Sequence, residues 1–319
     1  MLKTYVISLD YPTQLMATLP SKGLLPIWSP GVQGSALTEK EIRQNTTALC
    51  AAICTRPCIG IGMAHLNAWT SMLRNNDNYA LIVEDDVTFV PDFYEKLMEA
   101  LQHAPIDFDI LYLGCFGCTS DSSLLTVVGK AVGLIGITST TESVNSYFDR
   151  PSTVVGAHAY IVSKKGAKTL LHHIKGQLWT HIDYCIQPLI TSKKVDAYVI
   201  RPRIAFQTST DTTTSTNTMS IYPYVLQRAV KGVYLDDAFS ANYALTVIIA
   251  QIGLFPITFT SLLFLIVGVV AAFYRVSAVL LTVAFLVFSL PDFVVGSNLY
   301  SIMLHYLLLV GPCFNPYRL

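Results

Sequence analysis

Three consecutive carboxylates, Glu84, Asp85 and Asp86, are the residues of this sequence best suited to chemistry. They directly follow residues 79–83, an apolar and aromatic run that predicts a strand buried on both faces. Adjacent acids repel one another unless a cation or hydrogen-bond donors neutralise them. Hard oxygen ligands beyond the carboxyl end of a strand are typical of a Mg²⁺ or Mn²⁺ site that bridges to a substrate phosphate. The alternative is an acidic turn exposed to solvent.

The acidic run lies in a front region where strands and helices alternate. The predicted strands are residues 4–9, 24–28, 79–83, 108–114, 156–163 and 197–200, and the predicted helices are residues 41–50, 63–73, 93–101, 164–174 and 179–184. Thr38 and Glu41 fit a capping box, which favours a helix start there. This alternation predicts an α/β sandwich. Residues 119–151 are rich in Ser, Thr and Gly, and we expect a long loop or lid.

The composition divides the chain into a polar front and an apolar tail. Of the 319 residues, 52% are hydrophobic and 13% are charged, and the formal charges balance. A neutral chain gives no electrostatic support for nucleic-acid binding. After residue 237 the only charged residues are Arg275, Asp292 and Arg318. We expect a globular domain at residues 1–206, a Thr-rich linker at 207–237 and a transmembrane helical region at 238–319.

Within the tail, residues 244–273 are almost wholly apolar, and roughly 20 such residues suffice to cross a bilayer. We expect one transmembrane helix there, kinked at Pro256. Residues 276–290 and 293–310, separated by a Pro-Asp pair, predict two further short spans or one kinked hairpin. Asp292 is expected at a membrane interface, because a charge in mid-membrane is costly. A buried hydrophobic bundle is the alternative.

The cysteine pattern favours thiols over a metal site. Cys50, Cys54 and Cys58 recur every four residues and would share one helix face. Cys115 and Cys118 form a Cys-x-x-Cys pair, but no second pair follows at zinc spacing. Seven cysteines, an odd number, do not look like a disulfide framework. We expect buried or incidental reduced thiols, which fit a cytosolic domain.

Five segments of the front region, taken in order, resemble the family-25 glycosyltransferases, which include lipopolysaccharide and collagen-modifying galactosyltransferases. The segments are residues 5–9 (YVISL), Gly60-x-x-x-x-His65-x-x-x-Trp69, residues 79–87 (YALIVEDDV), residues 109–114 (DILYLG) and residues 157–167 (AHAYIVSKKGA). No single segment is specific, but the series in this order and spacing is. It covers about residues 3–200, and the apolar tail lies outside it.

The resemblance implies a GT-A-like, Rossmann-like fold, a nucleotide-sugar donor such as a UDP-hexose, and Mn²⁺ or Mg²⁺ as cofactor. It implies Asp86 and Glu84 as metal ligands. It implies donor contacts from Ser8, His65, Glu84 and Asp85. For His65, on an otherwise apolar helix, the alternative is a satisfied core histidine.

Members of this family are expected to invert the anomeric centre in one displacement, which needs a base for the acceptor hydroxyl. Asp183 is the first candidate, and Asp109, His158 and His181 remain alternatives. Asp183 is equally well explained as an acid that stabilises a helix N-terminus. The sequence departs from the family at residues 12–14 (PTQ), near which an arginine is usual. If that arginine helps to hold the donor in the family, its absence here would change donor affinity or donor choice.

These features predict a hexosyltransferase that moves galactose or glucose to a glycan, a lipid-linked acceptor or a hydroxylated protein. The missing arginine favours the alternative, a non-catalytic, membrane-anchored binding or scaffold protein, whereas the intact acidic triplet opposes it. A transporter is disfavoured, because the tail has few charges and no repeated hydropathy pattern. Since the N-terminus does not read as a signal peptide, we expect the catalytic domain in the cytosol; a sequon at Asn45 would suit the lumenal alternative.

Overall fold

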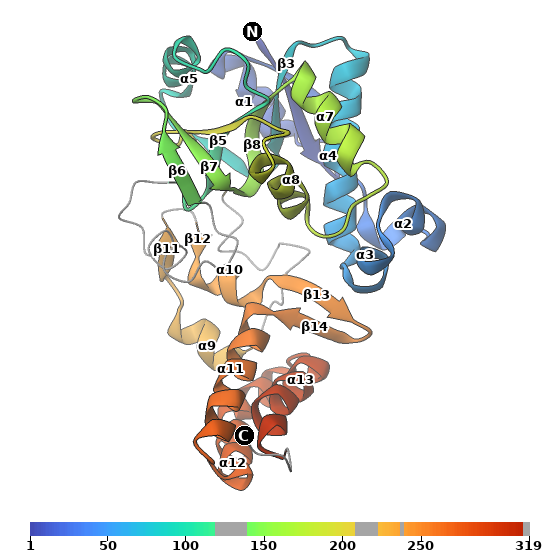
Figure 1. Ribbon diagram of the computed structural model, residues 1–319, viewed down its shortest axis with the longest axis vertical. Helices are drawn as coiled ribbons and strands as arrows, with labels where there is room; N and C mark the ends of the chain where they lie inside the picture. The colour runs from blue at the N-terminus through green and yellow to red at the C-terminus, as the bar shows by residue number, and fades with distance from the viewer. Residues whose placement is uncertain (119–138, 208–222, 237–238, 315–319) are drawn as a thin grey trace. The chain divides into compact units, whose positions relative to one another are not determined.

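The computed structural model describes residues 1–118, 139–207, 223–236 and 239–314. The chain forms two compact units (Figure 1). The first comprises Met1–Thr208 and Leu235–Ala238, and the second comprises Ser209–Tyr234 and Phe239–Leu319.

The first unit is built on an eight-stranded mixed sheet in the order β2-β1-β3-β8-β5-β9-β7-β6 (Figure 1). The strands are β1 Leu2–Ser8, β2 Leu24–Pro30, β3 Tyr79–Glu84, β5 Ile110–Phe116, β6 Ser139–Ser143, β7 Phe148–Thr153, β8 Val155–Ser163 and β9 Ala197–Ile200. Strand β1 is parallel to β2 and β3, and β5 is parallel to β9, whereas β8 runs antiparallel between β3 and β5. The predicted α/β class is confirmed as a Rossmann-like sheet with one reversed strand at its centre.

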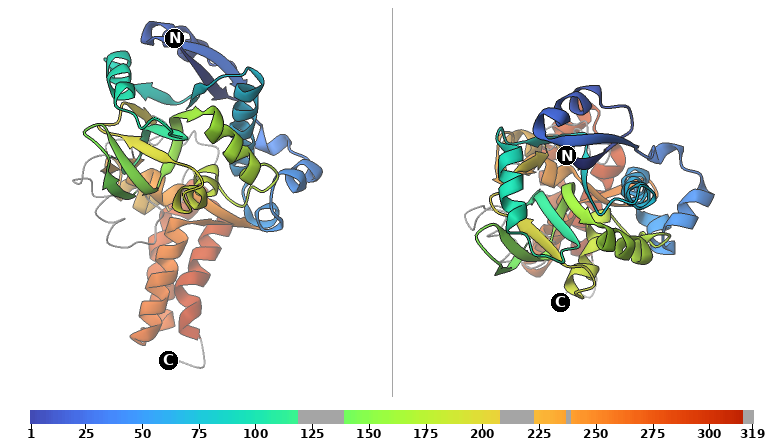
Figure 2. Two further views of the ribbon diagram at one scale, coloured as in Figure 1. Left: turned by 45° about the horizontal axis from the view of Figure 1, so that its top comes forward. Right: turned by 90° about the horizontal axis from the view of Figure 1, so that it is seen from above.

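Helices cover both faces of this sheet; α5 and α7, for example, lie on opposite faces (Figures 1 and 2). On β3, Ala80 and Ile82 join the core shared with α4, α7 and α8, whereas Leu81 and Val83 join the core shared with α5. Successive strand residues point to opposite faces, so this apolar run is buried on both, as predicted. The helices are α1 Thr13–Thr18, α2 Glu39–Asn45, α3 Ala48–Ile53, α4 Arg56–Arg74, α5 Phe93–Gln102, α7 Lys164–Ile174 and α8 Ile182–Thr191, with 3₁₀ turns η1 Leu19–Lys22 and η2 Gly34–Ala36.

A second, two-stranded sheet joins distant parts of the first unit. Strand β10, Ala205–Gln207, pairs antiparallel with β4, Val87–Phe89, so that Gln207 lies opposite Val87. Gly114 of β5 permits this close approach, because a Cβ there would lie 2.1 Å from the carbonyl oxygen of Ala205. Gln207, which the sequence pattern assigns to the Thr-rich linker, is therefore the last residue of a strand; residues 208–222 lie outside the described residues.

Two predictions for the front region are wrong. Residues 41–50 do not form one helix, because the Thr47 side chain accepts the Cys50 N–H at 3.3 Å and starts α3 as a separate helix. The predicted loop at residues 119–151 contains β6 and the start of β7, which pair as an antiparallel hairpin; residues 119–138 lie outside the described residues. The capping box at Thr38 and Glu41 is confirmed.

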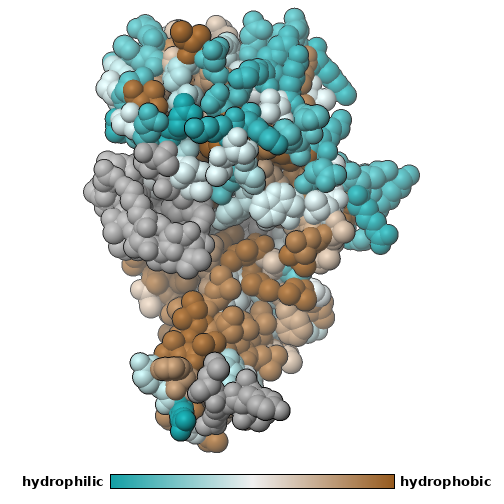
Figure 3. Space-filling view, viewed as in Figure 1, coloured by the Kyte–Doolittle hydropathy of each residue, from teal (hydrophilic) through white to brown (hydrophobic). Residues whose placement is uncertain are grey.

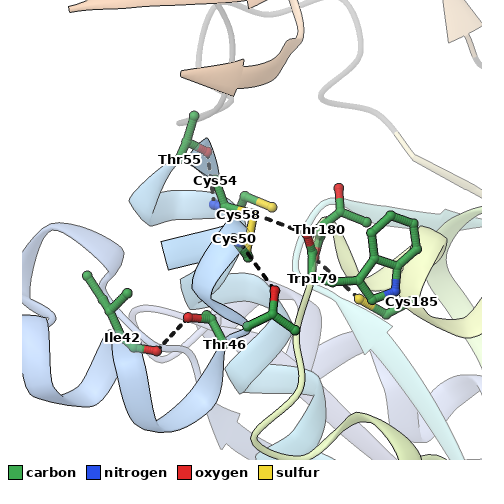
Figure 4. Close-up of a disulfide and its surroundings, with 10 residues drawn as sticks. Ile42, Thr46, Cys50, Cys54, Thr55, Cys58, Trp179, Thr180 and Cys185 are labelled. Atoms are coloured by element: carbon green, nitrogen blue, oxygen red, sulfur yellow. Dashed lines mark hydrogen bonds between the residues drawn. A yellow bond between two sulfur atoms is a disulfide. The ribbon is translucent and has the colours of Figure 1, made fainter. Parts of the chain in front are cut away.

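The cysteine interpretation is also wrong. Cys50 and Cys54 form a disulfide with an S–S distance of 2.13 Å (Figure 4). Cys115 and Cys118 form a second one. The three cysteines from Cys50 to Cys58 do not share one helix face, since Cys54 caps the end of α3 and Cys58 belongs to α4. The break between these helices turns Cys54 toward Cys50. The other described cysteines are buried and are not part of a disulfide: Cys58, Cys185 and Cys313.

The second unit contains three apolar helices, α11 Phe259–Phe273, α12 Ala278–Val295 and α13 Leu299–Val310, followed by the 3₁₀ turn η4 Gly311–Phe314. The predicted single helix over residues 244–273 is wrong. Its first half forms α10 Ala241–Thr246 and the hairpin of β13 Ile248–Ile252 with β14 Phe255–Thr258, which turns at Gly253 with φ +59°. Pro256 lies in β14, and α11 starts only after Thr258, whose side chain accepts the Ser261 N–H. The remaining elements are α9 Tyr224–Ala229, β11 Tyr234–Asp236 and β12 Phe239–Ser240.

The Pro-Asp pair does not divide the end of the tail. Helix α12 continues through Pro291 to Val295 and ends at Gly296, where φ is +73°. Asp292 is fully buried, and its Oδ1 accepts the Tyr224 N–H at 2.9 Å and the Ser297 hydroxyl at 2.8 Å. Among the described residues, α12 alone is long and apolar enough to cross a membrane, with a mean hydropathy of 2.3.

Candidate functional site

The acidic residues lie at one edge of the large sheet. Glu84 ends β3, and Asp85 and Asp86 form the turn into β4. Because β8 is antiparallel to β3, with Val83 opposite Ala159, the N-terminal end of β8 meets the C-terminal end of β3. The start of β8 and the acidic turn therefore share this edge, which is called the acidic edge below.

Two side chains outside the triplet hydrogen-bond its three acids. The Ser8 hydroxyl, at the end of the neighbouring strand β1, donates to Asp85. The Gln207 amide Nε2 donates to Asp86 at 2.9 Å and reaches Glu84 at 3.4 Å. The predicted residues Ser8, Glu84, Asp85 and Asp86 are thus brought together. Gln207 was missed because its strand pairing with β4 spans more than a hundred residues and leaves no local signal.

His65 links the acidic edge to the core. It is fully buried on α4, its Nδ1 lies 3.0 Å from the Tyr160 hydroxyl, and its Nε2 lies 3.4 Å from Glu84. The Trp69 indole N–H also donates to the Tyr160 hydroxyl, at 2.8 Å. Burial lowers the pKa of His65 to about 4, so the ring is neutral at physiological pH. His65 is therefore a satisfied core histidine that also contacts Glu84, and its donor contact stays a prediction.

Asp183 and His181 form a pair at the start of α8. Asp183 Oδ2 accepts the Gly156 N–H at 3.0 Å and lies 3.5 Å from His181 Nδ1. Among the described residues, no hydrogen-bond donor reaches the buried Oδ1 of Asp183. Since Gly156 belongs to the start of β8, this pair lies at the acidic edge. Asp183 also occupies the first turn of α8, where the helix dipole favours an acid.

The pKa values of these groups are coupled. Burial would raise the pKa of Asp183, but His181 and the Gly156 N–H lower it below its ordinary value. Burial would lower the pKa of His181, but Asp183 and then Glu84 raise it. Burial, followed by the charges of Asp86 and Asp183, raises the pKa of Glu84 well above 4.5. Ionisation of Glu84 is thus disfavoured at the acidic edge, and a bound cation would favour it.

The contacts of the two remaining base candidates, Asp109 and His158, are typical of structural residues. Asp109 precedes β5, at the opposite end of the strands from the acidic edge, where its Oδ2 accepts the Asp196 N–H at 2.9 Å and its Oδ1 lies 3.3 Å from the Lys165 ammonium. His158 is 2% exposed on β8, with its ring 5.6 Å from that of Phe116. The structure therefore separates Asp109 from the site and places His158 in the core.

His158 predicts a pH dependence of stability. Burial lowers its pKa from 6.5 to about 4, against the opposing charge of Asp183. Below pH 6.5 the unfolded chain binds a proton that the folded protein excludes, so stability falls as the pH drops toward 4, by about 3 kcal/mol for this group. In chemical denaturation, His158→Gln should lose less stability than the wild type between pH 7 and pH 5. Equal slopes in the wild type and in His158→Gln would contradict the burial argument.

The residues of the acidic edge fit a divalent cation. Among the described residues, no three His, Cys, Asp or Glu side chains gather as a self-sufficient metal cluster. Glu84 and Asp86 nevertheless converge on one amide group, and Mg²⁺ or Mn²⁺ commonly uses one or two carboxylates with substrate phosphates and waters completing the shell. Asp85 is tied to Ser8 and is less suited to share the ion.

Solved structures show only weak similarity to this chain. Among solved structures, HddC from Yersinia pseudotuberculosis complexed with GMP-PN matches with 13% identity and a TM-score of 0.31, over 56% of this chain and 82% of that one. The UTP-bound UGPase from Acinetobacter baumannii matches with 14% identity and a TM-score of 0.30, over 62% of this chain and 66% of that one. These similarities are too low to carry an argument. No curated protein matches.

The family model described as "Glycosyltransferase family 25 (LPS biosynthesis protein)" matches residues 1–186, more than half of the chain. This range contains β1, the acidic triplet, β8 and Asp183, and it agrees with the resemblance found in the sequence. The chain therefore belongs to glycosyltransferase family 25.

Proposed function

We propose that this glycosyltransferase moves a hexose, galactose or glucose, from a nucleotide sugar, with a UDP-hexose as first choice, to a hydroxyl of a glycan, a lipid-linked acceptor or a hydroxylated protein. The observation that carries the proposal is the acidic edge, where the triplet and the Asp183–His181 pair meet at the carboxyl end of β3. Open α/β sheets bind their ligands at this end of the strands.

In this proposal, Asp86 and Glu84 hold Mn²⁺ or Mg²⁺. A bound divalent ion would neutralise the charge that grows on the departing nucleoside diphosphate. Asp85, held by the Ser8 hydroxyl, faces ribose or sugar hydroxyls of the donor, and the buried His65 contributes through its contact with Glu84.

Asp183 is the proposed base in a single, inverting displacement. The acceptor oxygen forms a bond to the anomeric carbon while its proton passes to Asp183. The bond from the anomeric carbon to the diphosphate oxygen breaks, and its electron pair leaves with the nucleoside diphosphate. Two observations support Asp183: its pKa is lowered, which keeps it ionised, and its Oδ1 has no hydrogen-bond donor among the described residues.

The test is a screen of nucleotide sugars with the purified full-length protein in detergent, with Mn²⁺ and with EDTA. We expect release of nucleoside diphosphate from UDP-galactose or UDP-glucose with Mn²⁺ only, and a product of inverted anomeric configuration by proton NMR. Absence of release from every donor, with the protein folded, would contradict the proposal in favour of the non-catalytic alternative.

We further propose that α11–α13 lie in a membrane. Apolar side chains project outward along these helices, such as Ile266, Val279 and Val294 at 60%, 73% and 85% exposure. Figure 3 shows apolar residues gathered over the second unit. An exposed apolar surface this continuous costs free energy in water and is stabilised by lipid. Helix α12, with 18 residues, is about 27 Å long, close to the roughly 30 Å of a hydrocarbon core.

The proposed side for the catalytic unit is the cytosol, which holds nucleotide sugars. Protease added to sealed membrane vesicles whose cytosolic face is turned outward should digest residues 1–200. The Cys50–Cys54 disulfide favours the opposite, oxidising side. Full protection of the front region, with a glycan on Asn45, would contradict the cytosolic proposal. A control with detergent-opened vesicles should be digested in both cases.

A further inference from the structure

Gln207 occupies a position fixed by backbone pairing. Its strand β10 pairs with β4, and Gln207 lies opposite Val87, the residue that follows Asp86. The main chain therefore holds this side chain beside the acidic triplet, whatever residue stands at position 207. A substitution there changes the chemistry of the site more than its architecture.

The Gln207 amide contacts the two carboxylates assigned above to the cation. Its Nε2 donates to Asp86 at 2.9 Å and lies 3.4 Å from Glu84. One NH₂ group supplies two hydrogens, so a single amide can bridge two acids that otherwise repel each other. In the absence of a cation, this amide offsets part of their mutual repulsion.

An amide side chain is also suited to the cation-bound state. Rotation by half a turn about its last bond exchanges the NH₂ group for the carbonyl oxygen, and Gln carbonyls are ligands for hard divalent ions. A glutamate at this position would suit the cation-bound state only, and a leucine would suit neither. Gln is the side chain that serves both states.

We propose that Gln207 is a third ligand of the divalent ion and that its amide holds Glu84 and Asp86 together before the ion binds. This inference rests on the proposed metal site. It adds a residue from the C-terminal end of the first unit, outside the residues matched by the family model, to the site at the end of β3.

The test measures the binding of Mn²⁺, in the absence of a donor, to the full-length protein in detergent. Binding is followed by electron paramagnetic resonance of free Mn²⁺, and thermal unfolding is recorded in EDTA and in saturating Mn²⁺. Gln207→Glu should lower the Tm in EDTA, because three acids then repel, and should tighten the Mn²⁺ Kd roughly tenfold or more. Gln207→Leu should lower the Tm in EDTA and weaken the Kd by about 10- to 100-fold.

Gln187 provides the matched control. Its Nε2 donates to the Val154 carbonyl at 3.1 Å, so Gln187→Glu also loses a partly buried hydrogen bond from a side-chain amide. Gln187→Glu should nevertheless leave the Mn²⁺ Kd unchanged. Wild-type Mn²⁺ affinity in both Gln207 variants, with binding lost in Asp86→Ala, would overturn the Gln207 inference and leave the metal site intact. Absence of Mn²⁺ binding to the wild type would overturn the metal site itself, and the role of Gln207 with it.

Discussion

Asp86→Ala is expected to abolish sugar transfer and metal-dependent donor binding while the protein stays folded. The side chain is half-buried in the turn between β3 and β4 and contacts Gln207, so its removal takes away a proposed cation ligand without opening a cavity in the apolar core. A bound divalent ion stabilises the charge of a transition state by several kcal/mol, and this stabilisation would be lost together with its ligand. Initial rates at saturating donor, with thermal unfolding curves of both proteins, measure the effect.

Asp85→Asn is the graded control for this prediction. Its amide retains an oxygen that can accept the Ser8 hydroxyl, so we expect a milder loss of activity than in Asp86→Ala. Full activity of Asp86→Ala at saturating donor would reject Asp86 as a metal ligand. Equal losses in the two variants would assign the same role to both acids.

Asp183→Asn should lower the transfer rate by roughly 10²–10⁴-fold with little change in donor affinity. The amide preserves the size of the side chain and can still accept the Gly156 N–H, but it cannot take a proton from the acceptor. Single-turnover rates and the donor Kd, measured on the same preparation, separate the two effects. A parallel loss of donor affinity would assign Asp183 to binding.

Asp109→Asn is the matched control, because Asp109 is a buried acid at the opposite end of the strands. Its Oδ2 accepts the Asp196 N–H, and it lies beside Lys165. We expect Asp109→Asn to lower the Tm and to keep the transfer rate near wild type below that Tm. A rate loss as large as that of Asp183→Asn would contradict the separation of Asp109 from the site.

The sheet could be predicted because its strands are short apolar runs with clear boundaries. Residues 79–83 illustrate this, since a short uninterrupted apolar run with β-branched and aromatic residues is typical of a strand covered on both faces. The hairpin of β6 and β7 could not be predicted, because its Ser- and Thr-rich residues lack an apolar alternation and take their strand form from pairing with each other and with β9. The broken helix at Thr47 likewise depends on one local capping bond.

In the tail, the apolar composition of a segment does not decide whether it forms a helix or a hairpin. Residues 244–258 are as apolar as a membrane helix, yet Gly253 and Pro256 interrupt the helical pattern and the β-branched isoleucines suit the β13–β14 hairpin. Pro291 favours a helix end in the sequence, but α12 continues through it to Val295. Asp292 is satisfied by Tyr224 and Ser297, groups brought to it by the fold.

For the site, local motifs identified the residues that a single strand end presents, namely the triplet and, through the family resemblance, Ser8. They made Asp183 the first of four candidate bases but did not place any of the four relative to the triplet. Tertiary structure separates Asp109 from the acidic triplet, because the two lie at opposite strand ends although each is close to a conspicuous apolar run. Gln207 required knowledge of a pairing between β4 and β10, which sequence periodicity does not contain.

The central claim is that the acidic end of β3 binds a nucleotide sugar together with a divalent ion. Isothermal titration of UDP-galactose and UDP-glucose into the full-length protein, with Mn²⁺ and with EDTA, tests it most directly. We predict binding of at least one donor with Mn²⁺, none in EDTA, and none to Asp86→Ala under either condition. Donor binding of equal affinity to the wild type in EDTA and to Asp86→Ala, or no binding to the wild type at all, would contradict the claim.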